Sequence, residues 1–215
     1  MSIPLVSLPM DGPIATRPRV QSVYDTEAYN NAVDLVAKLT LFRNITAFQV
    51  ASISLTKTAG RDTNLETPTA LGKGDVLDWY GITLPILARD DLMTAANAVV
   101  FEEIARLRSL LWFTFNYGKT PYIGCQAEEI PAGAGTWDVQ TTHDAMTVIT
   151  PANTRNNRDA AYDITVNGYP DRITDRETFT VDLEATTTAP AVFSPTVELY
   201  PQCQLRGVLL RGIRG

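Results

Sequence analysis

Histidine and cysteine are scarce in this sequence of 215 residues, which contains one histidine and two cysteines. A zinc site needs about four Cys, His or carboxylate ligands at short spacing. Neither CxxC nor HExxH occurs, so we predict no metal centre. His143, which precedes Asp144, is interpreted as part of a solvated turn rather than as half of an acid/base pair.

Export signals and membrane spans are also lacking. The first residues, MSIPLVSLPMDGPI, have neither a basic n-region nor a long apolar h-region. No apolar run approaches the roughly 18 residues of a membrane span. Because we expect no secretion by the usual route, we predict that Cys125 and Cys203 are buried thiols. A disulfide between them stays possible if their strands are neighbours.

Positive charge is not in excess, and the net charge is −6. Proteins that coat nucleic acid use Lys and Arg to neutralise phosphates. We therefore expect no specific nucleic-acid partner. The hydrophobic content of 45% can fill a substantial core in a single large domain.

A complete phosphate-binding loop is missing, although Gly118-Lys119-Thr120 resembles the end of one. The motif needs a glycine five positions earlier, where Phe113 stands, and a helix after Lys-Thr, where Pro121 follows. Apolar residues on both sides predict a β-hairpin over 109–130 instead, with its turn at 116–119 and Lys119 exposed. We therefore expect no nucleotide, no other cofactor and no small-molecule substrate.

Catalytic arrangements are also absent. Glu128 and Glu129 are adjacent and are expected on opposite faces of a strand, while Glu102 and Glu103 are expected on the solvent face of a helix. No Gly-x-Ser-x-Gly elbow occurs. We predict that the protein is not an enzyme. A carbohydrate-binding groove would use exposed aromatic residues, and most of the candidates are expected in the core: Trp79, Tyr80, Trp112, Tyr117, Tyr122 and Trp137.

The elements that remain are mostly strands. Alternation with a period of two predicts strands from Thr46 and over 75–88 and 177–187, and Asn167-Gly168 predicts a tight turn. A polar loop is expected at 57–75, and apolar residues at helical spacing predict one inserted helix over 91–107. Roughly eight strands with one helix predict an antiparallel β-sandwich, with a jelly roll or an Ig-like arrangement as the natural topology.

The two ends of the chain each leave two interpretations open. Residues 1–24 are apolar, proline-rich and predicted to be an extended arm, which packs either on a neighbouring subunit or on its own domain. Asp25 is expected to cap a short helix after the arm. Near the C-terminus, Arg206, Arg211 and Arg214 either pair across an interface or protect a solvated edge strand.

The order of these features resembles the single jelly-roll capsid proteins of tailless icosahedral bacteriophages. The matching pieces are LFRN (41–44), LWFTFNYGKTPYI (111–123), EIPAGAG (129–135), ITDRETFTVDL (173–183) and QLRGVLLRGI (204–213). The resemblance implies an arm over 1–45 and one jelly-roll domain over 46–215. The chain lacks the basic N-terminal arm of shells that touch their genome directly.

As implied by this resemblance, the protein is a structural shell subunit in the virion, assembled in the host cytoplasm. Its partners would be copies of itself, other virion proteins, and an internal membrane or inner layer. The residues expected at assembly contacts are Ile3, Leu5, Val6, Leu8, Ile14, Glu102, Glu103, Arg106 and Arg214. The alternative is a virion spike, cement protein or carbohydrate-binding attachment module.

Overall fold

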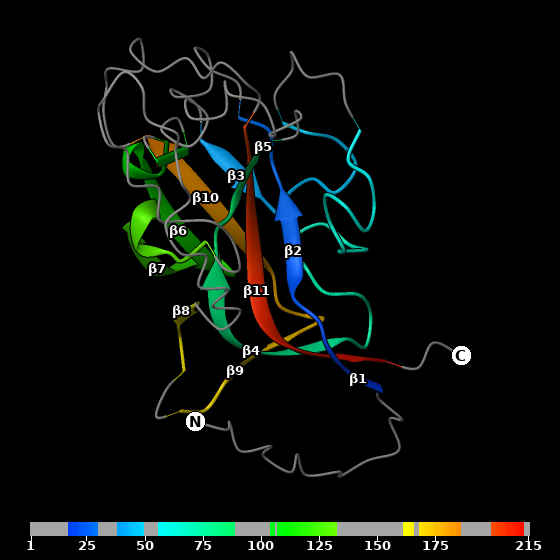
Figure 1. Ribbon diagram of the computed structural model, residues 1–215. Helices are drawn as coiled ribbons and strands as arrows, with labels where there is room; N and C mark the ends of the chain where they lie inside the picture. The colour runs from blue at the N-terminus through cyan, green and yellow to red at the C-terminus, as the bar shows by residue number, and fades with distance from the viewer. Residues whose placement is uncertain are drawn as a thin grey trace, which may run out of the picture.

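The computed structural model describes residues 17–29, 38–49, 56–88, 104–105, 107–132, 161–165, 168–185 and 199–212. Within these ranges the protein is mainly β, and its strands form two antiparallel sheets (Figure 1). The predicted mainly β, antiparallel class is confirmed.

The first sheet is built around β11, the longest described strand. β11 is flanked on one side by β1 and β2 and on the other by β4 and β5, and β4 in turn pairs with β8 and β9. The strands are β1 (Arg17–Val20), β2 (Val23–Thr26), β4 (Val76–Thr83), β5 (Ile86–Ala88), β8 (Tyr162–Asp163), β9 (Asp171–Thr174) and β11 (Leu199–Arg211).

The second sheet has the order β3-β10-β6-β7. Its strands are β3 (Leu39–Leu41), β10 (Phe179–Ala185), β6 (Leu111–Tyr117) and β7 (Thr120–Gln126), followed by the 3-10 helix η1 (Ala127–Glu129). β6 and β7 form the predicted hairpin, which is confirmed. In β10, Phe179, Val181 and Leu183 are fully buried, as their alternation predicts.

The pairings between the two halves of the chain are nested. β1 and β2 pair with β11, β3 pairs with β10, β4 pairs with β8 and β9, and β6 pairs with β7. The chain therefore folds back on itself about the β6–β7 turn. The pairs of β1 and β2 with β11 and of β4 with β8 and β9 lie in the first sheet, and the pairs β3–β10 and β6–β7 lie in the second.

β11 occupies the middle of its sheet, so the edge-strand interpretation of the C-terminal segment is wrong for residues 199–211 (Figure 1). Pro201 does not interrupt the strand either. It has no N–H to donate, but its carbonyl oxygen accepts a hydrogen bond from Glu27 N at 2.9 Å. Gln202 N then donates to Pro85 O at 2.9 Å, so pairing continues on the other side.

The N-terminal segment is divided by the structure. Residues 17–20 and 23–26, which were expected in the arm, are strands of the protein's own first sheet, and Leu39–Leu41 belongs to the second. Residues 1–16 lie outside the described residues. The expected helix cap at Asp25 is wrong, because Asp25 lies within β2 and pairs with Cys203 of β11.

The inserted helix is described only near its C-terminal end. Residues 104–105 and 107–110 are helical, so this end lies three residues beyond the predicted Leu107. Ile104 and Leu107 are buried, as predicted for the apolar stripe. The Arg108 guanidinium donates to Leu84 O at 2.7 Å and also to Ile130 O, which ties the helix to the first sheet and to the segment after η1.

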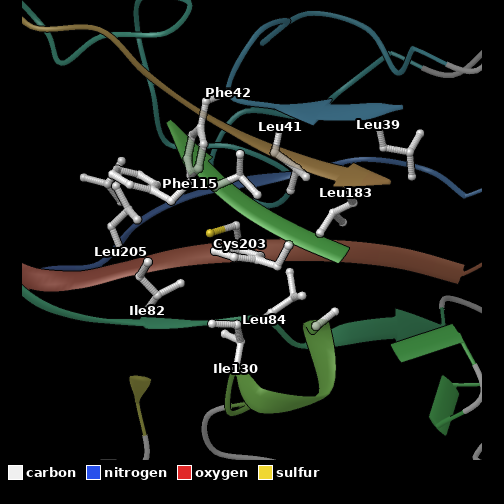
Figure 2. Packing of buried hydrophobic residues seen from close by; sticks show 14 of the residues in the cluster. Leu39, Leu41, Phe42, Ile82, Leu84, Phe115, Ile130, Leu183, Cys203 and Leu205 are labelled. Atoms are coloured by element: carbon white, nitrogen blue, oxygen red, sulfur yellow. The ribbon is translucent and has the colours of Figure 1, made fainter. Parts of the chain in front are cut away.

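Residues of both sheets share one hydrophobic core (Figure 2). Trp79 of β4 packs on Phe115 of β6, with ring centroids 4.8 Å apart, and Phe42 meets Phe179 edge-on at 5.2 Å. Each such buried side chain contributes about 1.5–3 kcal/mol. Cys125 and Cys203 are both buried and both free, which confirms the expected thiols.

Candidate functional site

The residues predicted as assembly contacts all lie outside the described part of the chain. They are Ile3, Leu5, Val6, Leu8, Ile14, Glu102, Glu103, Arg106 and Arg214. Trp137 and His143 lie outside it as well. The expectations for these residues stay predictions.

The Gly118-Lys119 turn joins β6 to β7, as the sequence predicts. Gly118 has a φ of 62°, which favours glycine, and its N–H donates to Thr178 O at 2.7 Å. Lys119 is exposed at the tip. With the Gly118 N–H already occupied and strand on both sides, this turn lacks the amide cradle of a phosphate-binding loop.

The aromatic candidates for a glycan site are divided between core and surface. Trp79 is 1% exposed, whereas Trp112 is 39% and Tyr122 is 46% exposed. The expectation that most of these residues lie in the core is therefore wrong for Trp112, Tyr122 and Tyr80. The Trp112 ring lies over Gly124 of β7, where an added Cβ would sit 3.5 Å from the ring.

The most unusual polar arrangement is a charged cluster of Lys57, Asp25 and Glu27 inside the fold. Lys57 Nζ lies 3.0 and 2.9 Å from the two carboxylate oxygens of Asp25 and 2.5 Å from Glu27 Oε1. All three side chains have 0% exposure. An ammonium has three N–H donors, and the backbone oxygen of Asn44, at 2.6 Å, completes its set of partners.

Two parts of the chain hold this charged cluster in place. Asp25 and Glu27 are two residues apart, so in extended chain they point to the same face, and β2 orients that face inward beside the buried Cys203. Lys57 begins the 57–75 loop. Its backbone N–H donates to Thr46 O at 3.0 Å, and its ammonium lies 5.7 Å from the centre of the Phe48 ring.

Backbone N–H groups hold the two carboxylates. Phe42 N donates to Asp25 Oδ2 at 2.6 Å, and Gln49 N donates to Glu27 Oε2 at 3.0 Å. Phe42 has a φ of 68°, an uncommon conformation for a bulky residue, which costs on the order of 1–3 kcal/mol. The LFRN turn thus adopts a strained backbone at the point where it contacts Asp25.

The loop after Lys57 covers the outer edge of β2. Tyr24 N donates to Asn64 Oδ1 at 2.9 Å, and Asn64 Nδ2 donates to Ser22 O at 2.7 Å. The Tyr24 hydroxyl donates to Gly60 O at 2.6 Å. These contacts replace a neighbouring strand, and they help to keep water away from the charged cluster.

Burial dominates the electrostatics of the charged cluster. It raises the pKa of Glu27 from 4.5 to about 7, although the nearby Lys57 ammonium acts in the opposite direction. It raises the pKa of Asp25 as well, for the same reason. One ammonium faces two carboxyl groups, so a proton on one carboxyl leaves the charged cluster without net charge.

Neither cysteine is poised for thiolate chemistry. Burial raises the pKa of the Cys203 thiol well above its usual value, and the charge of Asp25 adds to the effect. Burial also raises the pKa of Cys125 to about 11. A reactive cysteine needs the opposite shift.

No family model matches this chain, and no curated protein or solved structure is detectably similar to it. Within the described ranges, no three His, Cys, Asp or Glu residues are grouped as metal ligands. No helix in these ranges has the length and apolar character needed to cross a membrane. Arguments about function therefore start from the strand order and the charged cluster.

The sequence interpretation missed the charged cluster. Asp25 was assigned to a helix cap and Lys57 to a polar loop, while Glu27 was given no role. A usable indication existed in VYDTEAY, where Asp25 and Glu27 alternate in phase with Val23 and Tyr29. All four residues are buried, so the acidic residues continue the apolar face of this segment.

The charged cluster predicts a pH-dependent stability. Because the pKa of Glu27 is higher in the folded protein than in the unfolded chain, the folded state binds more protons between pH 4.5 and about 7. The stabilisation that the retained Glu27 proton gives the folded state is complete below pH 4.5, and it is lost as the pH rises to about 7. We expect Glu27→Gln to flatten the pH dependence of the free energy of unfolding in this window, as measured by urea denaturation.

Glu128→Gln is the matched control, because Glu128 is an exposed residue of η1. It should keep the pH dependence of the unsubstituted protein. An unchanged pH dependence in Glu27→Gln would show that Glu27 does not retain its proton on folding.

Proposed function

We propose that the two sheets form a jelly roll and that the chain is a structural subunit of a viral shell. The nested strand pairing carries this proposal. A jelly roll is an antiparallel hairpin of about eight strands rolled into two sheets, an architecture common in viral capsid domains. Grouping β1 with β2, β4 with β5 and β8 with β9 reduces the described strands to eight.

The strand order supports the topology in detail. We number the eight grouped strands 1 to 8 in their order along the chain. The first sheet, β1-β11-β4-β8, then has the order 1-8-3-6, and the second sheet, β3-β10-β6-β7, has the order 2-7-4-5. Every connection except the β6–β7 hairpin crosses from one sheet to the other. This is the arrangement that rolling a nested hairpin produces, and a meander would instead pair consecutive strands.

Self-assembly would use the surfaces that this fold leaves at its ends and edges. Residues 1–16 would form the arm, and burial of their apolar residues on a neighbour would contribute about 25 cal/mol per Å². Further proposed contacts are Glu102, Glu103, Arg106 and Arg214. The partners would be copies of the chain and other virion proteins, with an internal membrane or inner layer beneath the shell, and no specific nucleic acid. The protein would be found in virions assembled in the host cytoplasm.

Deletion of residues 1–16 tests the assembly proposal. The truncated chain keeps β1 and β2, so we expect an unchanged β spectrum by circular dichroism together with loss of assembly. Size-exclusion chromatography and electron microscopy should show shells or capsomers for the full chain and monomers for the truncated chain. A full chain that stays monomeric at high protein concentration and high salt would overturn the proposal.

The exposed aromatic residues favour a second candidate, a carbohydrate-binding attachment module. Trp112 of β6 is 39% exposed, and its ring lies over Gly124 of the neighbouring strand β7. Aromatic faces of this kind stack on sugar rings. Glycan binding by a monomer, lost in Trp112→Ala without loss of the fold, would favour this function over the shell.

A further inference from the structure

We propose that Lys57 and Asp25 condense into an intramolecular isopeptide bond, with Glu27 transferring the proton. The charged cluster places an amine, a carboxyl group and a second carboxyl group together in a buried site. These are the nucleophile, the electrophile and the acid/base group that amide formation requires. The inference is independent of whether the chain assembles.

The geometry brings the reacting groups within contact distance. Lys57 Nζ lies 3.0 and 2.9 Å from the two oxygens of Asp25, and therefore next to the carbon that carries them. The separation of reacting atoms in a near-attack arrangement is about 3–3.5 Å. Asn44 O and the backbone N–H groups of Phe42 and Gln49 hold the amine and the two carboxyls within this distance. Because Nζ is bonded to both Asp25 oxygens, it lies near the carboxyl plane, and attack requires this carboxyl to rotate until its face meets the nitrogen.

Burial favours the neutral reactants. An ammonium in contact with a carboxylate is unreactive, because the nitrogen lone pair is occupied and the carboxylate resists attack. Attack therefore requires a proton to move from Lys57 to Asp25, and burial lowers the cost of this transfer because no water stabilises the two charges. Phe48 on one side and Cys203 on the other provide the apolar surroundings.

The step balances without any further reactant. The Lys57 Nζ lone pair attacks Asp25 Cγ and forms the C–N bond. Glu27, as the acid, donates its proton to the departing hydroxyl group, and the C–O bond breaks to release water. Glu27 then accepts the proton that the nitrogen loses and returns to its initial form. The products are one amide and one water molecule, and nothing is oxidised or reduced.

Glu27 has the properties that this role requires. It lies 2.5 Å from the same nitrogen, and its raised pKa, about 7, lets it both donate and accept a proton near neutral pH. The amide would join β2 to the start of the 57–75 loop, across 32 positions in sequence. The bond would remain after the fold is lost, which suits a protein that must withstand mechanical or chemical stress.

Peptide mapping of the purified, folded full-length chain tests the proposal. After incubation at pH about 7, the protein is denatured, reduced and digested with trypsin. Trypsin cannot cleave after a Lys57 that is acylated. We expect one branched peptide in which residues 20–38 are joined to residues 44–61, with the mass of the two segments less one water molecule. Fragmentation should locate the junction at Asp25 and Lys57.

Three variants separate the chemistry from the packing. Glu27→Gln keeps the shape of the side chain but cannot exchange the proton, and it should remain uncondensed. Lys57→Arg keeps the positive charge without an amine that can condense, and it should show no branched peptide. Lys73→Arg changes an exposed lysine and should leave the branched peptide in full yield.

Separate peptides from the unsubstituted protein, with cleavage after Lys57, would overturn the proposal whatever the variants do. A branched peptide in equal yield from Glu27→Gln would overturn the role of Glu27. Loss of water at another site, without the joined peptide, would also count against the bond.

Discussion

Replacing Lys57 with methionine is expected to lower the free energy of unfolding by about 3–5 kcal/mol relative to the uncondensed protein, the usual cost of removing one partner of a buried ion pair. The ammonium is bonded to both Asp25 and Glu27, and none of the three side chains reaches solvent. In the described part of the chain, no other cation is paired with either carboxyl. Methionine fills a similar volume, so the loss comes from charge rather than from a cavity.

Urea denaturation at constant pH measures this loss, and Lys119→Met is the matched control. Lys119 is exposed at the β6–β7 turn, so the same substitution there should change the free energy of unfolding by less than about 0.5 kcal/mol. Adding Asp25→Asn and Glu27→Gln to Lys57→Met should recover part of the loss, because no uncompensated charge then remains. A loss below about 1 kcal/mol in Lys57→Met would mean that the carboxyl groups reach water.

Replacing Gly207 with alanine is expected to cost about 3 kcal/mol, at the upper end of overpacking effects. An added Cβ would lie 2.8 Å from Trp79 Cα and closer still to the carbonyl oxygen of Asp78. Both contacts are with the backbone of β4, which cannot rotate away as a side chain could. Gly207 also lies where the β11–β4 register shifts, so the two central strands would have to separate at their irregular point.

Gly124→Ala is the matched control for Gly207→Ala. It makes the same chemical change in a strand, but its Cβ would lie 3.5 Å from the Trp112 ring, an ordinary van der Waals contact. We expect its free energy of unfolding to stay within about 0.5 kcal/mol of the unsubstituted protein. If thermal or urea unfolding gives equal losses for the two variants, β11 and β4 do not approach as closely as the structure has them.

Local patterns along the chain were sufficient to predict several elements. The alternation in 177–187 predicted the three buried hydrophobic residues of β10, and the failed phosphate motif predicted the β6–β7 hairpin. In each case the neighbouring residues determine the result, because turn geometry and side-chain period act over a few positions.

Other features depended on pairing between distant segments, which no local pattern specifies. Residues 17–26 were read as an arm with a helix cap, although β1 and β2 pair with a strand nearly two hundred residues away. Because of the same pairing, the C-terminal strand β11 lies in the centre of its sheet, where the sequence interpretation allowed an edge strand.

The sequence by itself therefore determined the mainly β class, the buried apolar face of β10 and the β6–β7 hairpin. Only the tertiary structure decided the nested strand order and the charged cluster. Alternating carboxylates on a strand usually face water, since desolvating a charge is costly. Asp25 and Glu27 face inward because β11 pairs with β2. Phe42 of the LFRN turn and Gln49 supply N–H donors, and Lys57 supplies the ammonium, which together compensate for the lost water.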